Sequence, residues 1–318
     1  MVGKTSLLKA AGTTLMKQNI KVVYVNLWGA KGTNDFLKAL ARALNEEKSI
    51  IHKIKDIRIE GAIVGSSGIS ISLSKKPMTT LWDLLDAIGR QKEDYVIELD
   101  EVQELAAISG RLLKVLANLF NTHPNITFVF TGSMFGLMKT LLEPNSTSPL
   151  YGRSPAKLYV QPFNTECSKQ FLKKGFLQCN TSVPDAVIAS AVERLDGIPG
   201  WLTLYGNKIC VQRLTNEKAL EETTLEAYKI VNDELEHFFQ NRDRQAYLAA
   251  LKAAAAFSSW TEIKGAVSAV KGSLVNDNTA YRIIENLKAS MLLQEEKGRY
   301  RVDDPMLRSL LLTGADGM

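Results

Sequence analysis

The sequence predicts an α/β fold with a mostly parallel sheet in its first half and helices through most of its second half. Two observations support this. Short apolar segments rich in β-branched residues alternate with helical segments up to residue 163, as in βαβ units. The pattern then becomes entirely helical over residues 164–241, with one sharp break at "LDGIPGWL". The predicted strands of the sheet are 21–28, 94–101, 125–133 and 156–163.

The segments between these strands have their own patterns. A helical period follows "GKTS", and apolar spacing predicts further helices near 34–48, 79–91 and 111–120. Residues 54–74 alternate apolar and polar side chains around Gly65-Ser66-Ser67-Gly68, which favours a β-hairpin. We therefore expect the hairpin to be an insertion between the first two strands.

The last segment predicts a separate small domain. Three short helices follow Arg242, and residues 291–305 then read as a hairpin turning at Lys297-Gly298. Helices followed by two strands suggest a winged helix. The predicted domains are a core over 1–163, a helical lid over 164–241 and a winged-helix domain over 242–318.

Composition indicates a globular protein: of 318 residues, 45% are hydrophobic and 23% charged. No run of about 18 apolar residues suggests a membrane span, and the first residues lack the order of a signal peptide. Cys167, Cys179 and Cys210 are isolated, without disulfide or metal-site spacing. We expect a cytoplasmic protein with unpaired thiols.

The first candidate site is the motif Gly3-Lys4-Thr5-Ser6, the end of a phosphate-binding loop of the form G-x-x-x-x-G-K-[ST]. In such loops backbone N–H groups and the helix N-terminus hold phosphates, the lysine neutralises their charge, and the next hydroxyl binds Mg²⁺. Lys4 and Thr5 would fill these two roles, with ATP as the nucleotide. Four residues alone are a weak signal.

A second motif strengthens the prediction. "YVIELDE" is an apolar strand that ends in Asp100-Glu101, at the edge of a parallel sheet where ligands gather. Asp100 would lie behind the Mg²⁺, and Glu101 would accept a proton from the attacking water. A strand ending in solvated acids is the plain alternative. After "FVFTG", Ser133 could face the γ-phosphate with its hydroxyl; a helix N-cap is the favoured alternative, and both roles can hold together.

Together, GKTSLL, the DE strand, "PLYGRS", "VQPF" and "GIPGWL" resemble the archaeal ATPase family within the AAA+/STAND group of P-loop proteins. The resemblance extends over nearly the whole chain and implies an ATPase core, a helical lid and a winged helix. It implies that Arg153 senses or stabilises the γ-phosphate, and that Gly197 and Pro199 lie near the adenine. The alternatives are a surface arginine and a simple helix-breaking turn.

The beginning of the chain departs from that family, because the first positions of the phosphate loop and the strand before it would precede Met1. In the usual strand order, 5-1-4-3-2, this strand lies between "FVFTGS" and "KLYVQ", so its loss would leave two edges unpaired. We expect an in-frame upstream extension that encodes the strand and a glycine five residues before Gly3.

Charge bears on DNA as a partner. The net charge of +5 divides into +6 for residues 1–160, −2 for 161–242 and +1 for 243–318. A recognition helix over 274–290, capped near Asn276 or Asp277, would present Arg282, Asn286 and Lys288, and the hairpin adds Lys297, Arg299 and Arg301. Duplex affinity comes largely from neutralised phosphates, so a module with net +1 predicts weak binding.

Two classes of function remain open. The first is an ATP-driven switch or ATPase with the C-terminal domain as its output, and with a protein partner or an oligomer possible. The second is a binding module, either a nucleotide scaffold without turnover or a DNA-binding regulator. A GTPase is disfavoured because no N-K-x-D motif is found, and a nucleotide kinase because no arginine-rich lid is evident.

Overall fold

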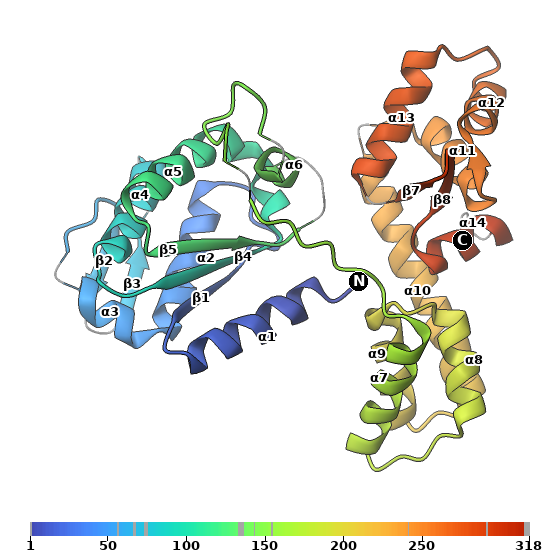
Figure 1. Cartoon of the computed structure of the whole chain (residues 1–318), viewed down its shortest axis with the longest axis horizontal. Helices are drawn as coiled ribbons and strands as arrows, with labels where there is room; N and C mark the ends of the chain where they lie inside the picture. The colour runs from blue at the N-terminus through green and yellow to red at the C-terminus, as the bar shows by residue number, and fades with distance from the viewer. Residues whose placement is uncertain are drawn as a thin grey trace. The chain divides into compact units, whose positions relative to one another are not determined.

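The computed structural model describes residues 2–55, 57–65, 68–72, 76–132, 137–142, 144–153, 155–240, 242–290 and 292–314. Contacts divide the chain into two compact units, residues 4–158 and residues 159–318 together with 1–3. The first unit holds the parallel sheet, and the second is mainly helical (Figure 1). The three domains predicted from the sequence stay a prediction.

The sheet of the first unit consists of β1 (Lys21–Asn26), β4 (Tyr95–Asp100) and β5 (Ile126–Phe130), in the order β1-β4-β5. All pairs are parallel, which confirms three of the predicted strands. Asn26 lies beside Asp100, so the carboxyl ends of β1 and β4 meet at one edge. Within the described residues β5 has no strand on its other side.

Helices cover both faces of this sheet. They are α1 (Lys4–Lys17), α2 (Thr33–Glu46), α3 (Lys48–Ile54), α4 (Pro77–Gly89), the 3₁₀ helix η1 (Val102–Ile108), α5 (Ser109–Thr122) and α6 (Leu137–Leu142). Figure 1 shows α1 on one side of the sheet and α4 and α5 on the other. The hairpin of β2 (Ala62–Gly65) and β3 (Gly68–Ile71) confirms the predicted insertion, with Ser66 and Ser67 outside the described residues.

The two faces differ in chemistry because successive strand residues point to opposite sides. Val23, Val25 and Ile97 belong to the large apolar core, with side chains of α2, α4 and α5. Tyr24, Glu98 and Asp100 alternate with them and therefore point to the other face, toward α1. The face beneath α1 is thus the polar side of the sheet.

The predicted fourth strand, 156–163, was wrong. These residues are described and form no strand, and Leu158 and Tyr159 are 79% and 58% exposed. A strand needs a neighbour for its backbone hydrogen bonds, and no described strand pairs with this segment. The apolar run in residues 156–163 reflects the hydrophobicity of the side chains, and it does not indicate whether a neighbouring strand is present.

The second unit begins with α7 (Thr165–Gln178), α8 (Asp185–Leu195), α9 (Pro199–Cys210) and the long α10 (Asn216–Phe239). The predicted break between α8 and α9 is confirmed at Asp196 and Gly197, both with positive φ. Gly197 has no room for a side chain, because a Cβ there would lie 2.0 Å from the carbonyl oxygen of Phe163. No helix in the described part of the chain is long and apolar enough to cross a membrane.

Three helices, a small antiparallel sheet and a last helix complete the described part of this unit. The helices are α11 (Arg244–Ala255), α12 (Trp260–Lys271) and α13 (Asp277–Ala289). The strands β6 (Ser258–Ser259), β7 (Leu293–Glu296) and β8 (Arg299–Val302) pair in the order β6-β8-β7, before α14 (Pro305–Thr313). The hairpin turn at Lys297-Gly298 and the Asn276 cap of α13 are confirmed; β6 and α14 were not predicted.

Candidate functional site

The predicted phosphate-binding residues form the first turn of α1. Lys4 and Thr5 are half-buried and Ser6 is exposed. This turn has no acidic side chain, so no negative charge offsets the positive end of the helix dipole. Gly3, just before it, has φ of 88°, a left-handed conformation that glycine adopts without a steric cost.

Two contacts show where this turn lies relative to the sheet. The Nζ of Lys9 is 4.8 Å from the centre of the Tyr24 ring. A Cβ on Gly12 would lie 3.2 Å from Val22 and 2.9 Å from Oε1 of Glu98. Because α1 passes Tyr24 before Val22, it runs antiparallel to β1.

This direction brings two predicted parts of the site to one edge. A helix rises about 1.5 Å per residue, so Thr5 lies roughly 10 Å beyond Gly12, toward the carboxyl ends of the strands. Asp100 lies about 7 Å beyond Glu98 in the same direction. Lys4, Thr5 and Asp100 therefore lie toward the same edge of the sheet.

Asp100 is buried, with 2% of its surface exposed. The hydroxyl of Tyr24 donates to its Oδ2 at 2.8 Å, and the hydroxyl of Thr131 donates to its Oδ1. Burial, followed by the bond to Asp100, raises the pKa of Tyr24 well above its usual value. The phenol therefore remains a proton donor, and both carboxylate oxygens of Asp100 are held in place.

A second buried carboxyl group precedes Asp100 on the same face. Glu98 is 1% exposed and faces Gly12 of α1. Burial and the neighbouring Asp100 raise the pKa of Glu98 to about 7. The absence of a side chain at Gly12 lets α1 approach the sheet closely at this point.

Glu101 has an unusual backbone for a residue with a side chain. Its φ of 60° and ψ of 46° place it in the left-handed region directly after β4. The Nε2 of Gln103 donates to Oε2 of Glu101 at 2.5 Å. The Oε1 of Gln103 is buried without a hydrogen-bond partner among the described residues.

The structure does not bring Arg153 to these acids. Its guanidinium donates to Oδ1 of Asn121 and lies 5.6 Å from the centre of the Phe120 ring. Both residues belong to the last turns of α5, which ends just before β5 begins, and so lie toward the opposite edge of the sheet from Asp100. The role predicted for Arg153 stays a prediction.

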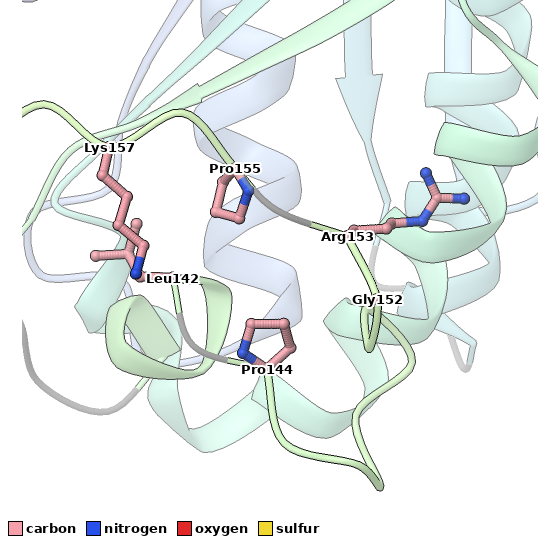
Figure 2. A pocket seen from close by; sticks show the side chains of 6 residues that line it. All are labelled: Leu142, Pro144, Gly152, Arg153, Pro155 and Lys157. Atoms are coloured by element: carbon pink, nitrogen blue, oxygen red, sulfur yellow. The ribbon is translucent and has the colours of Figure 1, made fainter.

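Arg153 also borders a cavity of about 210 Å³, lined by Leu142, Pro144, Gly152, Arg153, Pro155 and Lys157. Figure 2 shows the Arg153 side chain pointing away from Leu142 and Lys157. The Arg153 guanidinium therefore points away from the side of the cavity that Leu142 and Lys157 line.

Three other site residues were predicted from the sequence. Ser133 is outside the described residues. Gly197 and Pro199 belong to the unit of residues 159–318, at the turn into α9. Their assignment to an adenine site stays a prediction.

The residues at the carboxyl edge suit a nucleotide bound with Mg²⁺. A threonine hydroxyl and carboxylate oxygens are the hard oxygen donors that Mg²⁺ takes, usually with several waters. The described residues contain no cluster of three His, Cys, Asp or Glu that would hold a metal ion unaided. Thr5 and Asp100 therefore fit a metal ion that is also coordinated by phosphate oxygens of the nucleotide.

Sequence reasoning missed four residues here: Tyr24, Glu98, Gln103 and Thr131. Tyr24 reaches Asp100 from β1 and Thr131 reaches it from the end of β5, and only the strand order reveals these contacts. Gln103 and Glu98 flank the DE pair within two residues. For Gln103 and Glu98, closeness in the sequence to Asp100-Glu101 was the one signal that could have indicated a role.

The comparison with protein families decides the assignment. The model of an ATPase domain found predominantly in Archaea matches residues 1–204. The chain belongs to this archaeal ATPase family. The resemblance drawn from the motifs is thereby confirmed, and membership of an AAA+-like P-loop ATPase family implies nucleotide binding. No curated protein matches the sequence.

Solved structures agree with the family. The Walker-type ATPase PABY2304 of Pyrococcus abyssi is similar with a TM-score of 0.76 and 28% identity, over 98% of this chain and 88% of that chain. The ORC2 protein of Aeropyrum pernix, solved in ADPNP–ADP complexes, has a TM-score of 0.66 at 15% identity, over 99% and 84%. The second likeness concerns the fold alone.

Proposed function

We propose that this archaeal ATPase-family protein binds ATP with Mg²⁺ at the carboxyl edge of its sheet and hydrolyses it. The proposal rests on the direction of α1, which begins at the same edge of the sheet as the buried Asp100, whose two carboxylate oxygens are both hydrogen-bonded. Similarity to a Walker-type ATPase at 28% identity supports it.

In this proposal each residue has a distinct part. The N–H groups of the first turn of α1 and the ammonium of Lys4 bind the phosphates. Thr5 and Asp100 hold the metal ion, which when bound supplies positive charge to the γ-phosphate. Tyr24 and Thr131 hold the Asp100 carboxylate in place, because each of its two oxygens accepts a hydrogen bond from one of these hydroxyls.

Glu101 is the proposed general base. Its carboxylate accepts a proton from a water molecule whose oxygen bonds to the γ-phosphorus. The bond from that phosphorus to the bridging oxygen breaks, and ADP leaves with the electron pair. Ser133 is proposed to contact the γ-phosphate, and Gly197 and Pro199 the adenine. The γ-phosphate role of Arg153 stays a prediction, because in this structure its guanidinium bonds to Asn121, toward the opposite edge of the sheet.

We further propose that the C-terminal part is a winged-helix output module and that nucleotide state acts on it as a switch. Three helices, with β6 between the first two, and the β7-β8 hairpin that follows them support the name. A protein surface or a second copy is the preferred partner over DNA, because most basic side chains of α12, α13 and the hairpin form ion pairs.

Phosphate release from ATP tests this function. Glu101→Gln is expected to lower kcat by about 100-fold or more, with ATP still bound. Glu104→Gln, a nearby acid in η1, is the matched control and is expected to keep kcat within about twofold. A parent protein that binds ATP and releases no phosphate would identify the scaffold instead.

A further inference from the structure

The turn after β4 is held from several sides. The N–H of Val102 donates to the carbonyl of Thr131 at 2.9 Å, and the N–H of Thr131 donates to the carbonyl of Leu99 at 2.9 Å. The N–H of Glu104 donates back to the carbonyl of Glu101 at 3.1 Å. These bonds hold Glu101 in its left-handed conformation, which a residue with a Cβ adopts only at a cost. The backbone alone, however, leaves the Glu101 carboxylate free to rotate.

Gln103 restrains that carboxylate. The amide nitrogen of Gln103 donates to Glu101, so the amide oxygen of Gln103 faces away from that carboxylate. That oxygen is buried and has no partner among the described residues. A buried unpaired acceptor is unfavourable, so folding stability alone does not explain a glutamine here.

Gly132 provides the space for this arrangement. A Cβ at Gly132 would lie 2.2 Å from Oε1 of Gln103 and 3.4 Å from its Cδ. Any larger residue would therefore displace the amide and with it the hydrogen bond to Glu101. Gly132 and Gln103 belong to different segments that meet only in the folded protein, at the carboxyl ends of β5 and β4.

We propose that Gln103, seated against Gly132, is a positioning residue that holds the Glu101 carboxylate in the orientation from which it accepts the proton of the attacking water. This inference rests on the proposed ATPase function and names a determinant of that site beyond the phosphate loop and the acids. It predicts an effect on turnover, because Gln103 acts through Glu101.

Gln103→Met tests the proposal, since methionine keeps the length of the side chain and loses the donor. We expect kcat to fall by about tenfold or more, while KM for ATP stays within about twofold. Gly132→Ala should likewise lower kcat and leave KM nearly unchanged, because the added Cβ displaces the Gln103 amide. Gln170→Met is the matched control, because Gln170 donates to Glu166 at 3.1 Å on the exposed face of α7. It should leave both constants unchanged.

A double-variant cycle separates positioning from stability. In a Glu101→Gln background, adding Gln103→Met should cause no further loss of turnover, because the base it positions is gone. Thermal unfolding of each variant records any structural effect. A kcat of Gln103→Met within about twofold of the parent, or an equal loss in both backgrounds, would overturn the proposal.

The same measurements keep the two claims apart. If the parent hydrolyses ATP and Gln103→Met matches it, only the positioning role fails. If the parent binds ATP without turnover, the proposed hydrolysis fails and the positioning role fails with it.

Discussion

The phenol of Tyr24 on β1 donates a hydrogen bond of 2.8 Å to the carboxylate of Asp100 on β4, across 76 positions of the sequence. Both residues point to the face beneath α1, where Lys9 also lies over the Tyr24 ring. This bond joins β1 to the carboxyl end of β4 on the face that α1 covers. The orientation of the Asp100 carboxylate therefore depends on the pairing of β1 with β4.

Tyr24→Phe removes this donor and leaves the ring in place. We expect the free energy of unfolding to fall by about 1–2 kcal/mol, because a buried carboxylate oxygen loses its partner. Urea unfolding at neutral pH measures the change. Tyr151→Phe is the control, since Tyr151 is 65% exposed. Equal stability of the Tyr24 and Tyr151 variants would show that the bond contributes nothing.

Two glycine substitutions test the close approach of α1 to the sheet. Gly175→Ala in α7 meets nothing within 4 Å, so it should raise the free energy of unfolding by about 0.5–1 kcal/mol through helix propensity. Gly12→Ala would place a Cβ 2.9 Å from the Glu98 carboxylate and 3.2 Å from Val22. It should lower stability by about 1–3 kcal/mol. Stabilisation by both would mean that the α1 contact is loose.

The cysteines should differ in reactivity. Burial raises the pKa of the Cys210 thiol from 9.0 to about 11, whereas Cys167 and Cys179 are exposed. A raised thiol pKa leaves less thiolate at a given pH, so at pH 8 Cys210 has roughly 100-fold less thiolate than an ordinary thiol. A chromogenic disulfide reagent should therefore modify two thiols quickly, and the third faster as pH rises toward 11.

Cys210→Ser supplies the control for this experiment. The number of fast-reacting thiols should stay at two, because the substituted thiol belongs to the slow class. Three fast thiols in the folded parent, or a count that drops in Cys210→Ser, would contradict the burial of Cys210.

The C-terminal module should bind duplex DNA weakly. Lys264 pairs with Asp277, Lys288 with Glu285 and Glu295, and Arg299 with Glu262. Asn286, expected on the exposed face of the recognition helix, instead donates to the hydroxyl of Tyr247. Paired cations release few counterions, so affinity and its dependence on salt should both be small.

Fluorescence anisotropy of the full chain with a random-sequence duplex measures this affinity. We expect a dissociation constant above the micromolar range at physiological salt, with Glu285→Gln/Glu295→Gln binding more tightly because Lys288 is freed. Submicromolar binding by the parent would favour the DNA-binding regulator.

The parts of the fold that the sequence revealed are those whose signals are local. The strands at 21–26, 95–100 and 126–130 carry apolar runs, and the Asn276 cap and Lys297-Gly298 turn have their own residue preferences. The segment 156–163 has an equal apolar run and forms no strand, because strand formation also requires a neighbour.

The candidate site also contains residues with a local sequence signal and residues that only the fold brings together. Lys4, Thr5, Asp100 and Glu101 could be proposed from the sequence because their motifs are contiguous. Tyr24 and Thr131 lie far from Asp100 in the sequence and reach it only through the pairing of β1, β4 and β5. The contact between Arg153 and Asn121 likewise depends on where α5 ends, which no motif encodes.

The most direct test of the central claim is calorimetric titration of ATP with Mg²⁺ into the parent, Lys4→Ala and Lys17→Ala. Lys4 and Lys17 stand at opposite ends of α1, so only the first should matter for phosphate binding. We predict that the parent and Lys17→Ala bind ATP alike, and that Lys4→Ala loses about tenfold or more in affinity, because a charge-assisted contact to phosphate is removed. Unchanged ATP affinity in Lys4→Ala would contradict the assignment of the nucleotide site.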